Sequence, residues 1–119
     1  MKNKESDNLL DMIPEIQCKW VNDNNGKVSL VVPRFKNRFM KKVAVKLGKS
    51  EEVKIHLDAK GSNTWRLIDG YKTVEAIGKN LDQEENESIE QFYQRLCEFL
   101  MILAKNRFIR IKKEVIDNT

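Results

Sequence analysis

Few side chains in this 119-residue sequence have the types and spacing that metal binding or catalysis requires. The chain has one histidine, His56, and two cysteines, Cys18 and Cys97, which do not form a CxxC pair. Because a structural zinc site normally takes four Cys or His ligands, this composition argues against one. A disulfide between the two distant cysteines stays open, but reduced, buried thiols that behave as small hydrophobic groups are the favoured interpretation.

The remaining candidates for chemistry also have simpler structural explanations. His56 lies in an alternating segment typical of a surface strand, and Asp58 stands where a carboxylate caps a helix. The glycines form neither GxGxxG nor GxxxxGK[ST], so no phosphate-binding loop is indicated. Trp20 and Trp65 are interpreted as anchors of the core rather than as residues that stack on a ligand. The sequence therefore predicts a protein that is not an enzyme and has no metal or cofactor.

Composition sets the class of protein within broad limits. The chain carries 22 Lys and Arg against 18 Asp and Glu, and 40% of its residues are hydrophobic. This length and composition fit one compact domain with a modest core. The net charge of +4 is only mildly basic, and a dedicated nucleic-acid binder usually has a denser positive face.

No segment has the character of a targeting or membrane-spanning sequence. The first twelve residues lack the apolar core of a signal peptide. The longest apolar run, residues 99–104, is far shorter than the roughly 20 residues of a membrane span. We therefore expect a cytoplasmic protein without a membrane partner.

Alternation of apolar and polar residues predicts three strands. Residues 16–22 and 27–32 are joined by Asp23-Asn24-Asn25-Gly26, whose Asn and Gly residues favour a tight turn, and together they predict a β-hairpin. Residues 51–57 alternate in the same way and predict the third strand. The seven cations and no acids of residues 34–49 favour a solvated connector that contains a short amphipathic helix and docks a few aromatic residues.

Three helices are predicted after the third strand. The first begins at an N-cap, Asp58, and ends near Gly70, which suits the residue just beyond a helix. The second opens at Thr73 with half of a capping box and runs to about residue 81. The third opens with a full capping box at Ser88, runs to about residue 105, and can end with Asn106 in the left-handed conformation.

This order of elements predicts an α+β fold with a three-stranded antiparallel sheet followed by three helices. A short extended segment at residues 108–111 completes the domain, which we expect to span residues 16–112. Residues 1–15 are predicted to be a flexible arm with room for one short helical turn, and residues 113–119 a flexible tail.

The third predicted helix carries more apolar surface than a single core contact needs. Its apolar arc is about twice the width typical of a helix that covers one core. Either the helix is packed between several other elements, or one flank lines a groove for an apolar ligand segment. The two interpretations are compatible. The apolar residues are Ile89, Phe92, Tyr93, Leu96, Cys97, Phe99, Leu100, Met101, Ile102, Leu103 and Ala104.

Three segments in order resemble the PqqD family. In residues 56–70, an acidic residue follows the third strand, a bulky residue stands mid-helix and Asp69-Gly70 ends the helix. Residues 71–77, YKTVEAI, are similar to the family's [KR]TV-x-EI start of the second helix, with Ala76 where Glu is common. Residues 105–109, KNRFI, are similar to its L-x-x-x-G-L-[IV] ending, with Asn106 near the usual Gly. The resemblance covers roughly residues 16–112.

The resemblance implies a winged-helix-like domain called a RiPP recognition element, which works without a catalytic residue. Such domains bind the leader segment of a ribosomally made precursor peptide as an additional strand and present it to a radical SAM (S-adenosylmethionine) enzyme. The leader would lie beside the third strand and against the third helix, whose peptide-facing flank the sequence leaves open. The candidate peptide-binding residues are Val53, Lys54, Ile55, His56 and Leu57 on the strand, and Gln94, Arg95, Glu98, Met101, Ile102 and Lys105 on the helix.

Two other functions remain open from the sequence. A winged-helix DNA-binding protein has a similar architecture, and the cations of residues 34–49 could contact phosphates, but the third helix is too apolar for a major groove. A structural or assembly adaptor is the other alternative. Phosphate binding should weaken steeply with salt, whereas strand addition should weaken only mildly. An exposed edge strand also leaves homodimerisation by strand pairing open.

Overall fold

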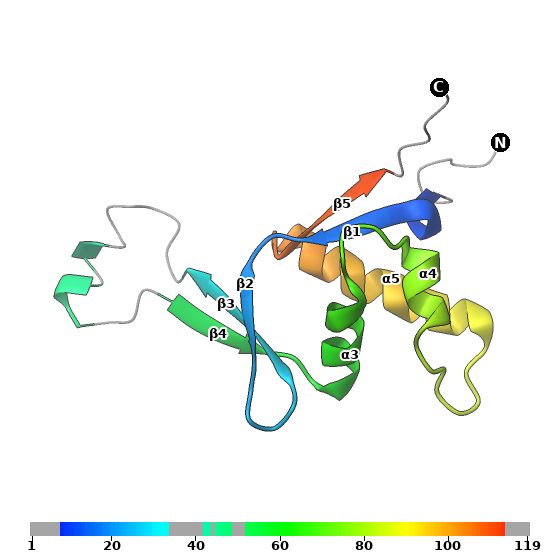
Figure 1. Cartoon of the computed structure of the whole chain (residues 1–119), viewed down its shortest axis with the longest axis horizontal. Helices are drawn as coiled ribbons and strands as arrows, with labels where there is room; N and C mark the ends of the chain where they lie inside the picture. The colour runs from blue at the N-terminus through cyan, green and yellow to red at the C-terminus, as the bar shows by residue number, and fades with distance from the viewer. Residues whose placement is uncertain (1–7, 34–41, 44, 49–51, 114–119) are drawn as a thin grey trace. The chain divides into compact units, whose positions relative to one another are not determined.

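The computed structural model describes residues 8–33, 42–43, 45–48 and 52–113, and the chain divides into two compact units (Figure 1). We call Cys18–Ser62 the sheet unit, and Met1–Gln17 with Asn63–Thr119 the helical unit. The elements in chain order are the 3-10 helix η1 (Asn8–Asp11), β1 (Met12–Ile16), β2 (Lys19–Asn22), β3 (Val28–Pro33), β4 (Glu52–His56), α3 (Ala59–Leu67), α4 (Val74–Lys79), α5 (Ile89–Lys105) and β5 (Ile109–Lys113).

The sheet unit contains a three-stranded antiparallel sheet in the order β2-β3-β4. Its first connection is the predicted turn, in which the Asp23 amide donates to the Lys27 carbonyl at 2.7 Å and the Gly26 amide donates to the Asp23 carbonyl at 3.0 Å. Gly26 has a φ of +80°, a conformation that glycine adopts without steric cost. The predicted hairpin and third strand are thus confirmed, with boundaries shifted by one to three residues.

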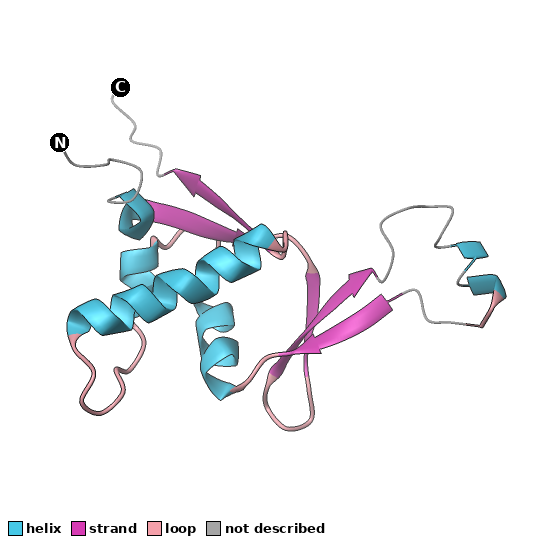
Figure 2. Cartoon of the chain, turned by 180° about the vertical axis from the view of Figure 1, so that it is seen from behind, coloured by secondary structure: helices cyan, strands magenta, loops and turns pink. Residues whose placement is uncertain are grey.

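The helical unit contains α4, α5 and an antiparallel pair of strands, β1 and β5, which lie side by side in both views (Figures 1 and 2). A long helix with one apolar face buries that face against other elements of its unit. Four residues of α5 are buried: Phe92, Leu96, Leu100 and Leu103. The other buried apolar residues of this unit are Ile13, Trp65, Ile68, Val74, Ile77 and Ile109.

The N-terminal segment differs from its prediction. The arm predicted for residues 1–15 is described from Asn8 onward, and there it forms η1 and β1, with Ile13 buried. The short helical turn matches η1, but β1 was not expected, because its partner β5 lies some 95 residues away along the chain. The predicted strand 16–22 is divided for the same reason, since the Gln17 amide donates to the Phe108 carbonyl at 2.9 Å. The predicted tail lies outside the described residues from position 114.

Most predicted helix boundaries are confirmed by their capping hydrogen bonds. Ser88 and Gln91 form the full capping box, and Thr73 Oγ1 accepts from the Ala76 amide at 3.1 Å. The prediction that Asn106 is left-handed is wrong: its φ is −89°, and the next residue, Arg107, has a φ of +63°. The Asn106 side chain instead donates to the Ile102 carbonyl at 2.8 Å and closes the end of α5 from within the helix.

The predicted α+β class, with a three-stranded antiparallel sheet and three helices, is confirmed. Of the basic segment 34–49, only residues 42–43 and 45–48 are described, and there the Leu47 amide donates to the Val43 carbonyl at 3.1 Å. The prediction for the rest of that segment lies outside the described residues. In the part of the chain that the structure describes, no helix is long and apolar enough to cross a membrane.

Candidate functional site

β4 lies at one edge of the sheet unit's three strands and pairs only with β3 within the described residues. The register places Leu30 opposite Ile55 and Ser29 opposite His56. An antiparallel edge strand directs alternate N–H and C=O groups away from its partner. The residues whose groups point outward are therefore the ones an added strand would bind.

One hydrogen bond fixes which residues of β4 point outward. The Leu57 amide donates to the Val28 carbonyl at 2.9 Å, one position beyond the Ser29–His56 pair. Because hydrogen-bonded and non-hydrogen-bonded pairs alternate along an antiparallel ladder, Ile55 and Val53 also direct their backbone groups toward β3. The backbone N–H and C=O groups of Lys54 and His56 consequently face the open edge.

The two faces of β4 differ in chemistry. Val53, Ile55 and Leu57 are half-buried and share one face. Lys54 and His56 are exposed on the other. The five strand residues predicted from the sequence thus lie together at one sheet edge, with the side chains that alternation predicts.

The His56 side chain belongs to a polar cluster that the sequence did not predict. Its Nδ1 lies 2.6 Å from Oγ of Ser29 and 3.5 Å from Oδ2 of Asp23, and the Ser29 hydroxyl itself donates to Asp23. The hydrogen bond from Ser29, more than the nearby His56, lowers the pKa of the Asp23 carboxyl below its usual value. Ser29 is fully buried on the middle strand.

This cluster contains a Ser, a His and an Asp, but it is not arranged as a catalytic triad. In a triad the Asp and the Ser contact different nitrogens of the imidazole, and the Ser is accessible to substrate. Here both contact Nδ1 of His56, and the Ser29 hydroxyl gives its proton to Asp23. The cluster therefore links the β2–β3 turn to the edge strand without activating a nucleophile.

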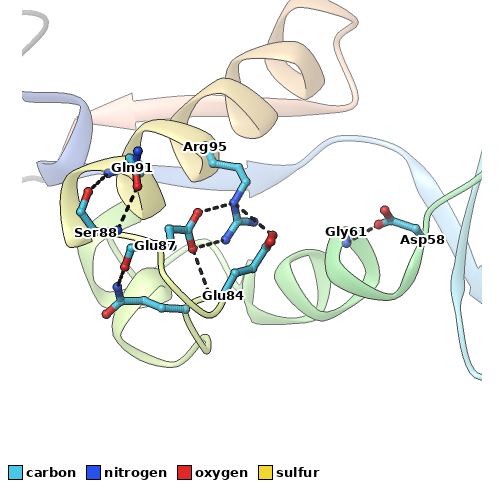
Figure 3. Close-up of polar contacts among 8 residues, drawn as sticks. Asp58, Gly61, Glu84, Glu87, Ser88, Gln91 and Arg95 are labelled. Atoms are coloured by element: carbon cyan, nitrogen blue, oxygen red, sulfur yellow. Dashed lines mark hydrogen bonds and ion pairs between the residues drawn. The ribbon is translucent and has the colours of Figure 1, made fainter.

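Asp58, the other acid near β4, is a helix cap as predicted. Its Oδ1 accepts from the Gly61 amide at 2.7 Å, a contact drawn in Figure 3. The carbonyl of Asp58 accepts from the Ser62 amide, and Ser62 Oγ in turn accepts from the Val28 amide at 2.8 Å. The start of α3 thus holds the first residue of β3, beside the end of β4.

The predicted residues of α5 lie on its exposed side. Met101 and Ile102 are 49% and 59% exposed although both are apolar, and Gln94, Glu98 and Lys105 are exposed around them. Gln94 donates to Glu98 at 3.4 Å along the same face. The buried side of the helix, by contrast, is formed by the large residues of the core.

Arg95 differs from the other α5 candidates, because its guanidinium group is already bound. Figure 3 shows it directed at the loop before α5, where its Nε and Nη2 donate to the two carboxylate oxygens of Glu87 at 2.9 Å each. Its Nε also lies 3.7 Å from Glu84, and the guanidinium group lies 5.6 Å from the centre of the Phe92 ring. This two-pronged pair holds the α4–α5 loop against the helix.

The β4 and α5 candidates belong to different compact units. The structure brings the five strand residues together at one sheet edge and the helix residues together on one exposed face. That one peptide contacts both sets stays a prediction.

The two cysteine thiols are partly buried. Cys18 and Cys97 are both free, as predicted, and partial burial raises the pKa of each thiol. A raised pKa lowers the thiolate fraction near neutral pH. Within the described ranges, no three His, Cys, Asp or Glu side chains are grouped to hold a metal ion.

The described residues thus define a small α+β protein with an open-edged antiparallel sheet in one unit and most of its helical residues in the other. Within that class, the chain belongs to the PqqD family. The family model, described as coenzyme PQQ synthesis protein D, matches residues 48–109, slightly more than half of the chain. The match includes β4 and all three described α-helices, and it confirms the family assignment from the sequence motifs. No curated protein and no solved structure matches the chain.

Proposed function

We propose that this protein binds the leader segment of a ribosomally made precursor peptide and presents it to a radical SAM enzyme that modifies the peptide. The leader would join the sheet unit as a fourth strand beside β4. The observation that carries this proposal is the open edge of β4, where Lys54 and His56 direct their backbone groups away from β3. Membership of the PqqD family supports a role beside a modifying enzyme.

The short length of the open edge limits how much backbone hydrogen bonding alone can contribute to the affinity for the leader. Two outward residues offer up to four hydrogen bonds, each worth about 0.5–1.5 kcal/mol net. Because association also costs translational and rotational entropy, side chains must supply much of the affinity. The half-buried faces of Val53 and Ile55 are beside the edge and can pack on aliphatic residues of the peptide.

The polar groups near the edge support a role without catalysis. Nδ1 of His56 is bound to Ser29, and Asp58 is bound to the Gly61 amide. The thiols have raised pKa values, so they are poor nucleophiles near pH 7. In this proposal the chemical step belongs to the partner enzyme.

The exposed apolar residues Met101 and Ile102 are the best candidates for a second contact with the leader, as the sequence predicted. Arg95 is a weaker candidate, because a peptide would have to compete with Glu87 for the guanidinium group. A contribution of α5 should therefore depend more on the two apolar side chains than on this arginine.

A proline scan of the sheet edges tests the proposal. Lys54→Pro removes an outward N–H of β4 and leaves the β3–β4 hydrogen bonds intact, because proline is tolerated at outward edge positions. The matched control is Lys113→Pro: this residue ends β5, and the Gln17–Phe108 hydrogen bond places its N–H outward by the same alternation. Leader-peptide binding is followed by amide NMR shifts and by calorimetry.

We expect the precursor's leader peptide to shift the amides of residues 52–57 at micromolar concentration. Lys54→Pro should weaken binding at least tenfold, and Lys113→Pro should not change it. Equal binding by both variants, with both still folded, would reject strand addition at β4. Duplex DNA serves as the comparison ligand, and a steeply salt-dependent response to DNA alone would favour the DNA-binding alternative.

A further inference from the structure

The edge of β4 combines two exposed basic side chains with two outward backbone positions. Lys54 and His56 are two residues apart and therefore lie on the same face of the strand. These are also the two residues that direct their N–H and C=O groups outward. A strand added here would place every second side chain directly beside Lys54 and His56, whichever direction it runs.

The hydrogen bonds around His56 determine which ring nitrogen carries the hydrogen when the ring is neutral. The Ser29 hydroxyl has one hydrogen, which it donates to Asp23, so toward His56 its oxygen acts as the acceptor. Nδ1 of His56 therefore carries a hydrogen, and in the neutral ring Nε2 is an acceptor. When the ring gains a proton, Nε2 becomes a donor and the side chain becomes a cation.

Described carboxylates near this face are already bound by other groups. Asp23 accepts from Ser29 and lies 3.5 Å from Nδ1 of His56, and Glu52 lies 3.8 Å from Lys19. No described carboxylate forms an ion pair with Lys54. The charged groups that face His56 are thus Asp23, behind the ring, and Lys54, on the same strand face.

We infer that the β4 edge selects a segment with the pattern acidic–aliphatic–acidic, with the two acidic side chains beside Lys54 and His56 and the aliphatic one beside Ile55. This inference rests on the proposed function and names the chemistry of the segment that the edge accepts. The two faces of β4 supply the complementarity: the basic side chains of Lys54 and His56 on one and half-buried aliphatic residues on the other. Opposite charges placed directly across two strands attract, and like charges there repel.

Binding of an acidic residue beside His56 should also be linked to proton uptake. A carboxylate has no hydrogen to give to the neutral Nε2, but it can accept one from the protonated ring. The preference for the acidic segment should therefore be greater when the ring is protonated than when it is neutral. A segment with amides in place of the acids should show a much smaller change, since an amide can donate to the neutral ring.

Three synthetic seven-residue peptides that differ only at two positions test the inference. Each has Thr and Val alternating, with Glu-Val-Glu, Gln-Val-Gln or Lys-Val-Lys at its centre, and binding is measured on the full chain from the NMR shifts of residues 52–57. We expect the Glu peptide to bind about 3- to 20-fold more tightly than the Gln peptide at low salt when His56 is protonated, as two cross-strand charge pairs then predict. The Lys peptide should bind most weakly.

The Lys54→Glu variant supplies the matched exchange of charge. It should lose the preference for Glu and bind the Lys peptide better than wild type does, while Lys113→Glu, on the other unit, should keep the wild-type order. Equal binding of all three peptides to wild type would overturn the charge selection and leave strand addition intact. If no peptide shifts the β4 amides, the proposed function fails together with this inference.

Discussion

Nδ1 of His56 and Oγ of Ser29 lie 2.6 Å apart, directly across the ladder between β3 and β4. The same buried hydroxyl donates to Asp23, the first residue of the turn between β2 and β3. One hydroxyl thus connects the turn, the middle strand and the edge strand of the sheet unit. Because this hydroxyl lowers the pKa of Asp23, the cluster should be visible in the pH dependence of the protein.

Removal of this hydroxyl is expected to raise the pKa of Asp23 and to destabilise the sheet unit. Ser29→Ala deletes the largest cause of the lowered pKa and leaves two polar groups without their shared partner. Loss of the buried hydroxyl should reduce the free energy of unfolding by about 1–2 kcal/mol. NMR titration of the carboxyl carbons and urea unfolding measure the two effects.

The sign of the accompanying pH effect follows from the direction of the shift. The pKa of Asp23 is lower when folded, so its ionised form stabilises the fold above its unfolded pKa of about 3.9 and this contribution is lost as the pH falls. In the Ser29→Ala variant, the stability that is lost as the pH falls should be smaller. The pKa of Asp69, which depends on Lys72 and Tyr71, is the control in the same spectra. An unchanged pKa of Asp23 in Ser29→Ala would contradict the prediction.

Arg95→Lys tests whether Arg95 is a clamp of the α4–α5 loop. Lysine keeps the charge but cannot bind both oxygens of Glu87 at once. Because the arginine side chain is 40% exposed, the cost should be modest, about 1 kcal/mol in urea unfolding. Hydrogen exchange should increase at the Glu84 amide, which donates to Glu87 at 3.0 Å.

Gln94→Ala is the matched control, since Gln94 is exposed on the same helix and lacks a contact to the loop among those described. We expect leader binding to be retained in Arg95→Lys. A large loss of binding with unchanged exchange at Glu84 would instead show that Arg95 contacts the peptide directly, as the sequence first predicted.

The sequence was sufficient for features that depend on neighbouring residues. The capping box of Ser88, the cap at Asp58 and the alternation of residues 51–57 each act over a few positions. The residue types at such positions depend directly on the local backbone conformation. The structure confirms these predictions. The motif order that indicated the PqqD family is local in the same sense.

Features that depend on distant pairing were not predictable in the same way. β1 forms because Ile13 is buried and its strand pairs with β5, which no local pattern in residues 8–16 indicates. The link between His56 and Ser29 needs the register of two strands joined by a long connection. In the sequence, the only signal was a lone histidine and a serine at polar positions of two alternating strands.

Gly78→Ala is expected to destabilise the packing of α4 on α5. An added Cβ would overlap Cε1 of Tyr93, whose hydroxyl donates to the Glu75 carbonyl at 3.1 Å. Alanine favours a helix by up to about 1 kcal/mol over glycine, but a contact this short forces the ring to move. Overpacking should dominate, with a net loss of about 1–3 kcal/mol.

A double-mutant cycle separates these two effects. In a Tyr93→Leu background the ring is absent, so Gly78→Ala should be neutral or stabilising there. Lys79→Ala, at the exposed neighbouring position, should change the unfolding free energy by less than about 0.5 kcal/mol in both backgrounds. If Gly78→Ala costs the same with and without the ring, the close approach of Tyr93 is not the cause.

Asp69 should contribute an acid-sensitive part of the stability of the helical unit. Its Oδ1 accepts from the amides of Tyr71 and Lys72 at 2.9 and 2.8 Å, and its Oδ2 pairs with Lys72 Nζ at 2.8 Å. The contacts with Lys72, side chain first, hold the pKa of this carboxyl far below its usual value. They fix the turn that contains Gly70, whose φ is +82°.

Because the folded pKa is lowered, this stabilisation is present above the unfolded pKa of about 3.9 and is lost as the pH falls below it. Asp69→Asn keeps an acceptor for the two amides and removes the charge, so its stability should depend less on pH between 4 and 2. Asp69→Ala should in addition cost about 1 kcal/mol at pH 7 through loss of the turn contacts. Urea unfolding at pH 7, 4 and 3 measures both variants, and parallel pH profiles for wild type and Asp69→Asn would show that the ion pair with Lys72 does not stabilise the fold.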